Sequence, residues 1–450
     1  MDGLLIALEG AVVLGMIYLG VRTGGVGLGV WGGVGVFILV FVFQLDPGTP
    51  PIDAVLIILA VILASSTMQA AGGIDWLVSV ATRLIQANPK RITLIAPLVS
   101  CLFTMGAGTG NVYYPLIPVI SDLSAANGVR PERPLGIASV ASQMGVAASP
   151  VSAAMAVMVS LMEPVGFTLP EILLIMIPAT FVGILVAGIA MLRWGPELAD
   201  DPVYKERVAS GQLNMDELRA AAFASAKALP ASAARSAYIF LTGVVAIVVL
   251  GIVEGLRPQV SDGEGGTEAL SMTITIQLVM FLVTALIIVL CHVKSSDITK
   301  ASILIAGIVA IVALFGLAWM ADTFISANEN EIVSALGGIT KSAPWTFAII
   351  LFAVAALTTS QSGATRAIIP IGIALGIAPQ FLVGMWPSVI GIYFFPANGS
   401  QIAAVQFDKT GTTKIGKYVL NHSFMPPLLV AWVVSVLVGS GIAILVYGTG

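Results

Sequence analysis

Charged side chains are confined to short clusters in this sequence, and long stretches between the clusters contain none. Only 10% of the 450 residues are charged and 58% are hydrophobic, whereas a soluble domain carries about 25% charged residues. A helix that crosses a lipid bilayer needs about 20 apolar residues. The pattern therefore predicts a polytopic helical membrane protein and excludes a soluble enzyme, a nucleic-acid-binding protein and a disordered chain. The uncharged runs are 23–45, 54–74, 92–121, 134–162, 172–192, 236–253, 269–293, 301–321, 342–365, 367–407 and 418–450.

The runs divide into ten expected spans and two expected re-entrant hairpins. The hairpins, 92–127 and 346–378, enter the membrane and turn back, because each has a polar, glycine-containing break near its middle. These breaks are Gly106–Asn111 and Ser360–Thr365. Full crossing of the membrane by either hairpin is the alternative. The expected spans are 4–20, 26–44, 53–71, 135–162, 169–193, 236–256, 272–292, 301–321, 380–407 and 422–448.

The distribution of basic residues favours re-entry of both hairpins. With two re-entrant hairpins, seventeen of the 20 Lys and Arg residues fall on one side of the membrane, and the positive-inside rule makes that side cytoplasmic. Arg257 and Lys341 fall on the other side, and Arg366 falls within the membrane. Full crossing by one hairpin would invert every later span and remove this asymmetry. Both termini are therefore expected in the periplasm.

The order of elements indicates two repeats of one plan. Residues 1–193 and 236–450 each contain three spans, a hairpin, a broken span and a final span. The first half starts outside and the second starts inside, so the repeats are inverted, as in many secondary carriers. The segment 194–235 between them is charged, and the run Asp216–Ala221 predicts a short amphipathic helix in a cytoplasmic linker. The segment 75–91 reads as an interfacial helix or, equally, as a plain connecting helix.

Two of the spans contain a second kind of break. The span 135–162 includes Ala147–Ser152 with Pro150 at its centre, and the span 380–407 includes Phe395–Ser400. Proline disrupts the helical turn before it, and unwound backbone at membrane depth is tolerated where it is buried in protein or lines a wet cavity. An ordinary proline kink explains one such break, but four breaks in matching places favour a shared central site.

The chemistry of these breaks suits an anion with two negative groups. Each break creates a helix N-terminus, whose free N–H groups and dipole attract negative charge. Glycines allow close approach of the backbone, and Ser, Thr and Asn supply donors. The candidate substrate-binding residues are Gly108, Thr109, Gly110, Asn111, Ser149, Pro150, Ser152, Ser360, Gln361, Ser362, Gly363, Thr365, Arg366, Asn398, Gly399 and Ser400.

Arg366 is the candidate with the clearest chemical meaning. An intramembrane guanidinium is costly and is a functional hypothesis by default, and arginine makes bidentate bonds to carboxylates. We place it on the first turn of a half-helix. The alternative is a structural ion pair with an internal acid, for which Glu9 and Asp122 are the candidates. A fixed positive charge weakly favours exchange of anions over cation-coupled symport. The sequence holds neither a phosphate-binding loop nor a metal-ligand set, so no cofactor or metal is expected.

Several short blocks, spread over nearly the whole chain, form a recognisable pattern. They are Gly35–Val36, Phe41–Gln44, Asp46–Pro51, Gln69–Gly73, Gly108–Asn111, Arg130–Pro134, Ser149–Ser152, Gln406–Lys417 and Asn421–Phe424. In these blocks the chain resembles the anaerobic C4-dicarboxylate carriers of the Dcu A/B type. The segment Phe395–Ser400 departs from the family pattern, in which Pro-Thr-Tyr-Pro is common, and this leaves substrate preference open.

The resemblance implies an exchanger of fumarate, succinate, malate and aspartate in the bacterial inner membrane. It also implies kinship with elevator-type carriers of the ion-transporter superfamily. The expected partners are dicarboxylate substrates, the lipid bilayer, a second copy of the chain and a regulatory sensor protein, with no nucleic acid. A Na⁺- or H⁺-coupled uptake symporter is the first alternative. A dicarboxylate sensor subunit that moves nothing is the second, which the shortness of 194–235 disfavours.

Overall fold

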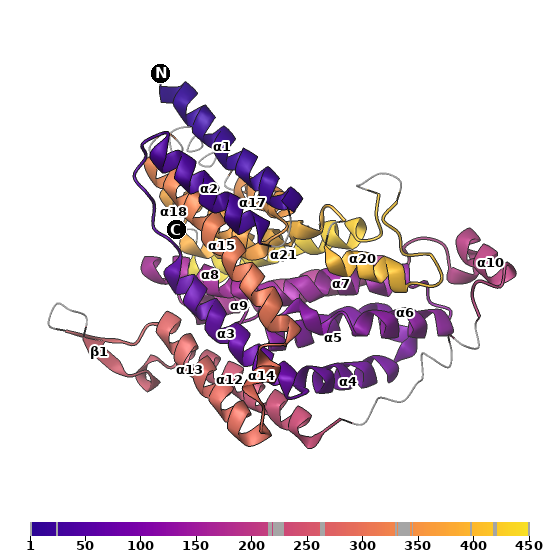
Figure 1. Ribbon diagram of the computed structural model, residues 1–450. Coiled ribbons are helices and arrows are strands. Elements are labelled where there is room, and N and C mark those ends of the chain that lie inside the picture. Colours follow the sequence, from indigo (N-terminus) through magenta and orange to yellow (C-terminus); the bar gives the residue numbers. More distant parts are fainter. Residues whose placement is uncertain are drawn as a thin grey trace.

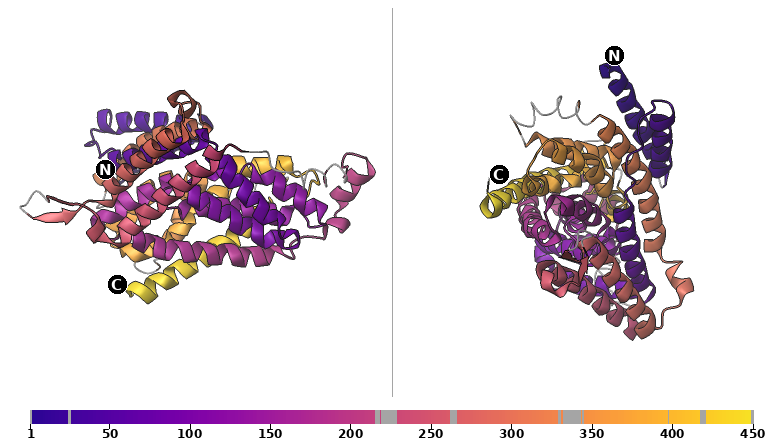
Figure 2. Two further views of the ribbon diagram at one scale, coloured as in Figure 1. Left: turned by 90° about the horizontal axis from the view of Figure 1, so that it is seen from below. Right: turned by 90° about the vertical axis from the view of Figure 1, so that its left-hand side faces the viewer.

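The computed structural model describes residues 2–23, 26–214, 218, 229–261, 266–328, 331, 343, 345–396, 398–416 and 421–448. This part of the chain is mostly helical (Figure 1). The strands β1 and β2 and the helix α10 lie at opposite ends of the molecule, and the views in Figures 1 and 2 agree on this.

Seven helices in the described part are long and apolar enough to cross a membrane. Six of them correspond to expected spans, and the seventh, α5, is the first arm of the expected hairpin 92–127. The seven are α3 (Ile52–Ala70), α5 (Ile92–Ala107) with the short turn η1 (Pro89–Arg91) before it, α9 (Leu169–Met191), α12 (Ala231–Ile252), α13 (Met272–Cys291), α15 (Ser302–Ala327) and α21 (Met425–Tyr447). Shorter apolar stretches lie in α1 (Asp2–Thr23), α2 (Gly27–Phe41), α8 (Ala153–Met162) and α17 (Thr346–Thr358).

The helix is interrupted in both expected hairpins and in both expected broken spans. In the first hairpin α5 is followed by η2 (Gly110–Val112) and α6 (Leu116–Ala126), and in the second α17 is followed by α18 (Gln361–Ala374). The first broken span consists of α7 (Glu132–Ala147) and α8. The second consists of α19 (Pro379–Met385), the 3₁₀ segment η6 (Trp386–Tyr393) and α20 (Gly399–Phe407).

Short elements connect these helices. The segment expected at the interface forms α4 (Gly73–Gln86), which buries Leu77, Ala81 and Ile85 on one face. In the linker, α10 spans Pro202–Ala209, whereas the expected helix at Asp216–Ala221 lies outside the described residues except for Leu218. The other connecting elements are η3 (Glu163–Val165), η4 (Leu198–Asp200), η5 (Glu254–Leu256) and α14 (Ser295–Ile298).

The expectation of a purely helical protein is wrong for one loop. β1 (Gln259–Ser261) and β2 (Thr267–Ala269) pair antiparallel, with Gln259 opposite Ala269. The strands are three residues long and mostly exposed. Such short strands give no clear alternation in the sequence, which is why hydropathy alone does not reveal them.

The packing partners in the two halves correspond. α1 packs on α2, and α12 packs on α13; α5 packs on α7, and α17 packs on η6. The cross-half contacts correspond as well, because α2 meets α15 while α3 meets α13. Glycines permit the closest of these approaches: a Cβ on Gly29 of α2 would lie 1.9 Å from the carbonyl oxygen of Val312 in α15. Small residues serve this purpose between membrane helices, because they let the backbones come together.

A buried charged cluster fastens the linker to the helical body. Arg130 pairs with Asp201 of the linker, and its Nε lies 2.6 Å from Glu132 Oε2. Glu132 Oε1 also accepts a hydrogen bond of 2.7 Å from Ser423 Oγ. Burial raises the pKa of Asp201, but backbone N–H donors and Arg130 outweigh it, so the pKa lies below its usual value. The cluster joins the linker, the start of α7 and the loop before α21.

Candidate functional site

The first hairpin turns at Gly108. α5 ends at Ala107, and Gly108 then adopts a left-handed conformation with φ of +68°, which glycine reaches without steric cost. Thr109 follows in an extended conformation, and its Oγ1 accepts a hydrogen bond of 3.3 Å from the Asn111 N–H. The predicted turn is therefore built from the residues that the sequence offers for it.

The second hairpin turns earlier than the sequence suggests. Thr359 takes the left-handed conformation, with φ of +51°, and Ser360 caps α18 by accepting a hydrogen bond of 3.1 Å from the Gly363 N–H. Residues 361–365 are therefore helical rather than part of the break. Gly363 serves packing instead: a Cβ there would lie 3.2 Å from Leu317 Cδ2 of α15 and 3.1 Å from Ser360 Oγ.

The first broken span is interrupted between Ala147 and Ala153. Ser149 Oγ accepts a hydrogen bond of 3.3 Å from the Val151 N–H, and Ser152 Oγ caps α8 by accepting one of 3.1 Å from the Met155 N–H. Both serines and Pro150 are buried. Their hydroxyl groups satisfy backbone groups that the break leaves without a helical partner.

The second broken span restarts with a capping box. The Asn398 side chain accepts a hydrogen bond of 3.0 Å from the Ser400 N–H, and Gln401 Oε1 accepts one of 3.1 Å from the Asn398 N–H. The buried Tyr393 hydroxyl bonds to Ser400 Oγ, and Gln401 Nε2 donates to the Tyr393 carbonyl at 3.0 Å. These bonds tie the end of η6 to the start of α20 across the unwound segment.

Contacts through α7 and the first tip bring the four breaks together. Gln361, at the second tip, donates from Nε2 to the Gln143 carbonyl at 2.9 Å. At the first tip, a Cβ on Gly110 would lie 2.6 Å from Gln143 Nε2, and one on Gly108 would lie 2.5 Å from the Val151 carbonyl oxygen.

The second broken span meets the first hairpin beyond its tip. A Cβ on Gly399 would lie 2.6 Å from the hydroxyl of Tyr114. α20 also packs on α6 and on α7. Both hairpins and both broken spans therefore meet in one region.

Access separates the candidate residues into two groups. Residues of the accessible group are partly or fully exposed. Residues of the other group are buried, and their contacts stabilise the conformation of the breaks. Thr365, for example, accepts a hydrogen bond of 2.8 Å from Trp386 Nε1. The accessible residues are Gly108, Thr109, Gly110, Asn111, Ser360, Ser362, Arg366, Asn398 and Gly399. The buried residues are Ser149, Pro150, Ser152, Gln361, Gly363, Thr365 and Ser400.

Arg366 differs from expectation in two ways. α18 begins at Gln361, so Arg366 stands in the second turn rather than the first. Neither expected acid pairs with it, because Glu9 accepts a hydrogen bond from Asn328 and Asp122 lies 3.5 Å from Lys409.

The acids that act on Arg366 belong to other helices. Asp322 of α15 and Asp53 of α3 attract its charge. Among the residues that the structure describes, none forms a hydrogen bond or close ion pair with the half-buried guanidinium. Within this part of the chain, its N–H donors are open to a ligand.

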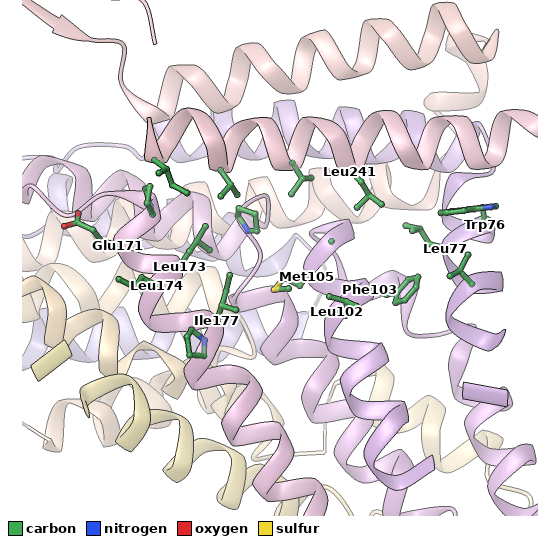
Figure 3. Close-up of a pocket in the computed structure, with 18 residues that line it drawn as sticks. Trp76, Leu77, Leu102, Phe103, Met105, Glu171, Leu173, Leu174, Ile177 and Leu241 are labelled. Atoms are coloured by element: carbon green, nitrogen blue, oxygen red, sulfur yellow. The ribbon is translucent and has the colours of Figure 1, made fainter. Parts of the chain in front are cut away.

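A cavity of about 910 Å³ lies beside these breaks and not at their meeting point. Residues of α12, α4, α5 and α9 line it, and it reaches Gly106 and Pro150. Figure 3 shows Leu241 across the cavity from Leu102 and Met105, with Trp76 and Glu171 at opposite ends. Its wall is apolar, so it offers little to bind a dicarboxylate.

Sequence reasoning missed several residues of this region. Gln143, where both tips meet, lies inside an apparently continuous part of α7. Tyr113 is fully buried and bonds through its hydroxyl to Ser139 Oγ at 2.9 Å, and Tyr114 reaches Gly399. A polar residue on an apolar span next to a break is the signal that points to Gln143. Within the described ranges, no group of three His, Cys, Asp or Glu side chains could hold a metal ion.

Comparison with known proteins identifies the family. The family model of the anaerobic C4-dicarboxylate membrane transporters matches residues 5–447. The chain belongs to this family. It is 39% identical over 441 residues to the anaerobic C4-dicarboxylate transporter DcuB of Escherichia coli O6:H1, covering 97% of this chain and 98% of that protein. It is 38% identical over 437 residues to the C4-dicarboxylate transporter DcuA of Wolinella succinogenes, with the same coverage.

Two solved structures share the fold at low sequence identity. MtrF of Neisseria gonorrhoeae, from work on a class of antimetabolite efflux pumps, has a TM-score of 0.58 at 13% identity over 93% of this chain and 85% of that one. The Alcanivorax borkumensis YdaH transporter also has a TM-score of 0.58, at 15% identity over 93% and 98%. The resemblance in sequence is thus confirmed. The protein is a multi-pass inner-membrane transporter, and its family is one of transporters rather than enzymes.

Proposed function

We propose that this protein exchanges C4-dicarboxylates, namely fumarate, succinate, malate and aspartate, across the bacterial inner membrane by alternating access. The observation that carries the proposal is the meeting of both hairpins and both broken spans, with both tips at Gln143. The family and the curated relatives named for C4-dicarboxylates support this substrate class.

The site suits a ligand with a carboxylate at each end. The N-termini of α8, α18 and α20 begin at the breaks, and helix N-termini favour negative charge. Thr109, Asn111 and Ser362 are accessible enough to donate hydrogen bonds from the tips. Arg366 provides a guanidinium that matches carboxylate geometry. We assign it to one end of the substrate.

The same arrangement favours exchange over cation-coupled uptake. Arg366 already supplies a fixed positive charge to balance an anion, which is the task that Na⁺ performs in a symporter. The unloaded carrier would then hold in its membrane interior a guanidinium that Asp322 and Asp53 attract without a close ion pair in the described part of the chain, which is costly. Return of the carrier with a second dicarboxylate avoids this cost, so the transport cycle becomes an exchange.

We propose inverted repeats and an elevator-type movement as the mechanism. The corresponding packing pairs in the two halves support the repeats. α10 and the strands β1 and β2 lie at opposite ends of the molecule (Figure 1), which supports a cytoplasmic linker and a periplasmic strand pair. We propose that both termini are periplasmic as well. The hairpins and broken spans would move as one body against α1, α2, α3, α12, α13 and α15.

Exchange in proteoliposomes tests the proposal. Vesicles loaded with succinate should take up labelled fumarate or aspartate, and empty vesicles should not. Uptake into loaded vesicles should be independent of a Na⁺ gradient. Uptake into empty vesicles that requires a Na⁺ or proton gradient would establish the symporter instead. If the protein binds dicarboxylate but neither loaded vesicles nor vesicles with a cation gradient take it up, the protein is a dicarboxylate sensor rather than a transporter.

A further inference from the structure

A second groove lies between α12 and α13, and its lining is distinct from that of the cavity in Figure 3, although α12 contributes to both. It encloses about 730 Å³, and its walls are almost entirely apolar. Ala246, Leu250, Val279 and Leu282 line it. Gly243 lets the helices approach at its floor, because a Cβ there would lie 2.3 Å from Val283 Cγ2. Both helices are apolar enough to span the membrane, so the groove faces hydrocarbon.

One end of the groove carries a fixed positive charge. Arg235 lines the groove and is exposed, and its Nη1 donates a hydrogen bond of 2.6 Å to the Leu290 carbonyl near the end of α13. This bond holds the guanidinium at the mouth, and its other N–H donors have no hydrogen-bond partner among the residues that the structure describes. Lys294, three residues after the end of α13, adds a second exposed cation close to this end.

Aromatic rings mark the same end as a membrane interface. Tyr238 lines the groove one turn from Arg235, and its ring lies 5.0 Å from that of Trp76. Trp and Tyr gather at the level of the lipid headgroups. The groove extends from this level into the bilayer. Leu250 follows Arg235 by about 15 residues, or about 22 Å of helix, which exceeds the roughly 15 Å half-thickness of the hydrocarbon core.

We propose that this groove is a binding site for one anionic phospholipid. The phosphate binds Arg235, and an acyl chain lies along the groove between α12 and α13. A basic residue at the interfacial end of an interhelical groove is the arrangement that selects anionic headgroups. α12 and α13 belong to the part of the protein that is proposed to stay fixed, and the lipid site uses no residue of the hairpins or the broken spans. It therefore stands whether or not the protein exchanges dicarboxylates.

Native mass spectrometry of the purified full-length protein tests this proposal. The probes are dioleoyl-phosphatidylglycerol, which is anionic, and dioleoyl-phosphatidylcholine, which has the same chains and no net charge. We expect one phosphatidylglycerol to bind more tightly than phosphatidylcholine. Arg235→Gln should reduce that preference about fivefold, which corresponds to about 1 kcal/mol for one basic residue near a membrane surface. Arg235→Lys should keep most of it.

Two further variants distinguish binding of the lipid in the groove from a general attraction of anionic lipid to basic side chains. Arg83→Gln removes another exposed arginine that also donates to a backbone carbonyl, at 3.3 Å from Ser79 O, but that is not part of the groove. It should leave the preference unchanged. Ala246→Phe fills the groove and leaves the charge, and it should displace the bound lipid. Equal binding of the two lipids to the wild type, or unchanged preference in Arg235→Gln or Ala246→Phe, would overturn the proposal.

Discussion

Replacement of Gly108 by alanine tests whether the first hairpin tip must touch the first broken span. The residue has φ of +68°, and a Cβ would lie 2.5 Å from the Val151 carbonyl oxygen and 3.0 Å from Val151 Cγ2. The left-handed conformation costs an alanine about 1–2 kcal/mol. Overpacking against backbone, which cannot rotate away, adds about 1–3 kcal/mol. We therefore expect Gly108→Ala to cost about 2–5 kcal/mol in the free energy of unfolding.

Gly128 supplies a matched control at the other end of the same hairpin. Its φ is +72°, and a Cβ there would meet nothing within 4 Å. Gly128→Ala therefore has the conformational cost of about 1–2 kcal/mol and no steric cost. The difference between the two variants isolates the contact between the tip and the break.

Two measurements distinguish the variants. Melting followed by tryptophan fluorescence in detergent should show a lower melting temperature for Gly108→Ala than for Gly128→Ala. Succinate–fumarate exchange in liposomes, at equal amounts of inserted protein, should be nearly normal in Gly128→Ala and strongly reduced in Gly108→Ala. If the two variants melt and transport alike, the close approach of Gly108 to Val151 is unimportant to both the fold and the site.

Three further outcomes are expected. Gln361→Ala removes the hydrogen bond to the Gln143 carbonyl and should lower stability by about 1 kcal/mol and slow exchange; normal exchange would show that this contact is dispensable. Asp201 has a lowered pKa, so its pairing with Arg130 stabilises the protein above the unfolded pKa of about 3.9 and is lost as pH falls through the folded value. Asp201→Asn should thus have a lower melting temperature than the wild type at pH 7, and this difference in melting temperature should become smaller in acid. A difference that does not change with pH would show that ionisation of Asp201 does not contribute to stability. Arg366→Ala should abolish dicarboxylate binding by folded protein and Arg366→Lys should leave weak transport; unchanged affinity of Arg366→Ala, with and without Na⁺, would contradict a substrate contact.

The sequence by itself determined the class of protein and three of the four places where helices break, and it placed the fourth a few residues too late. Long apolar runs without charge have one stable solution in a bilayer, because a helix satisfies its own backbone hydrogen bonds. Pro150 and Gly108 act on the backbone locally, so their effects could be predicted without knowledge of the fold. Blocks such as Gln406–Lys417 also carried the family resemblance that the comparisons confirmed.

The tertiary structure decided which residues meet. Gln361 and Gln143 are 218 positions apart, and no local pattern predicts their contact. The second tip turns at Thr359, before the expected break Ser360–Thr365, and Ser360 caps the helix that begins at Gln361. Gly363 instead packs beside Leu317 of another helix. Likewise, the acids that attract the charge of Arg366 are Asp322 and Asp53. The sequence suggests Glu9 and Asp122 instead. Local backbone conformation depends on near neighbours along the chain. These contacts instead depend on the simultaneous packing of many helices that are distant in the sequence.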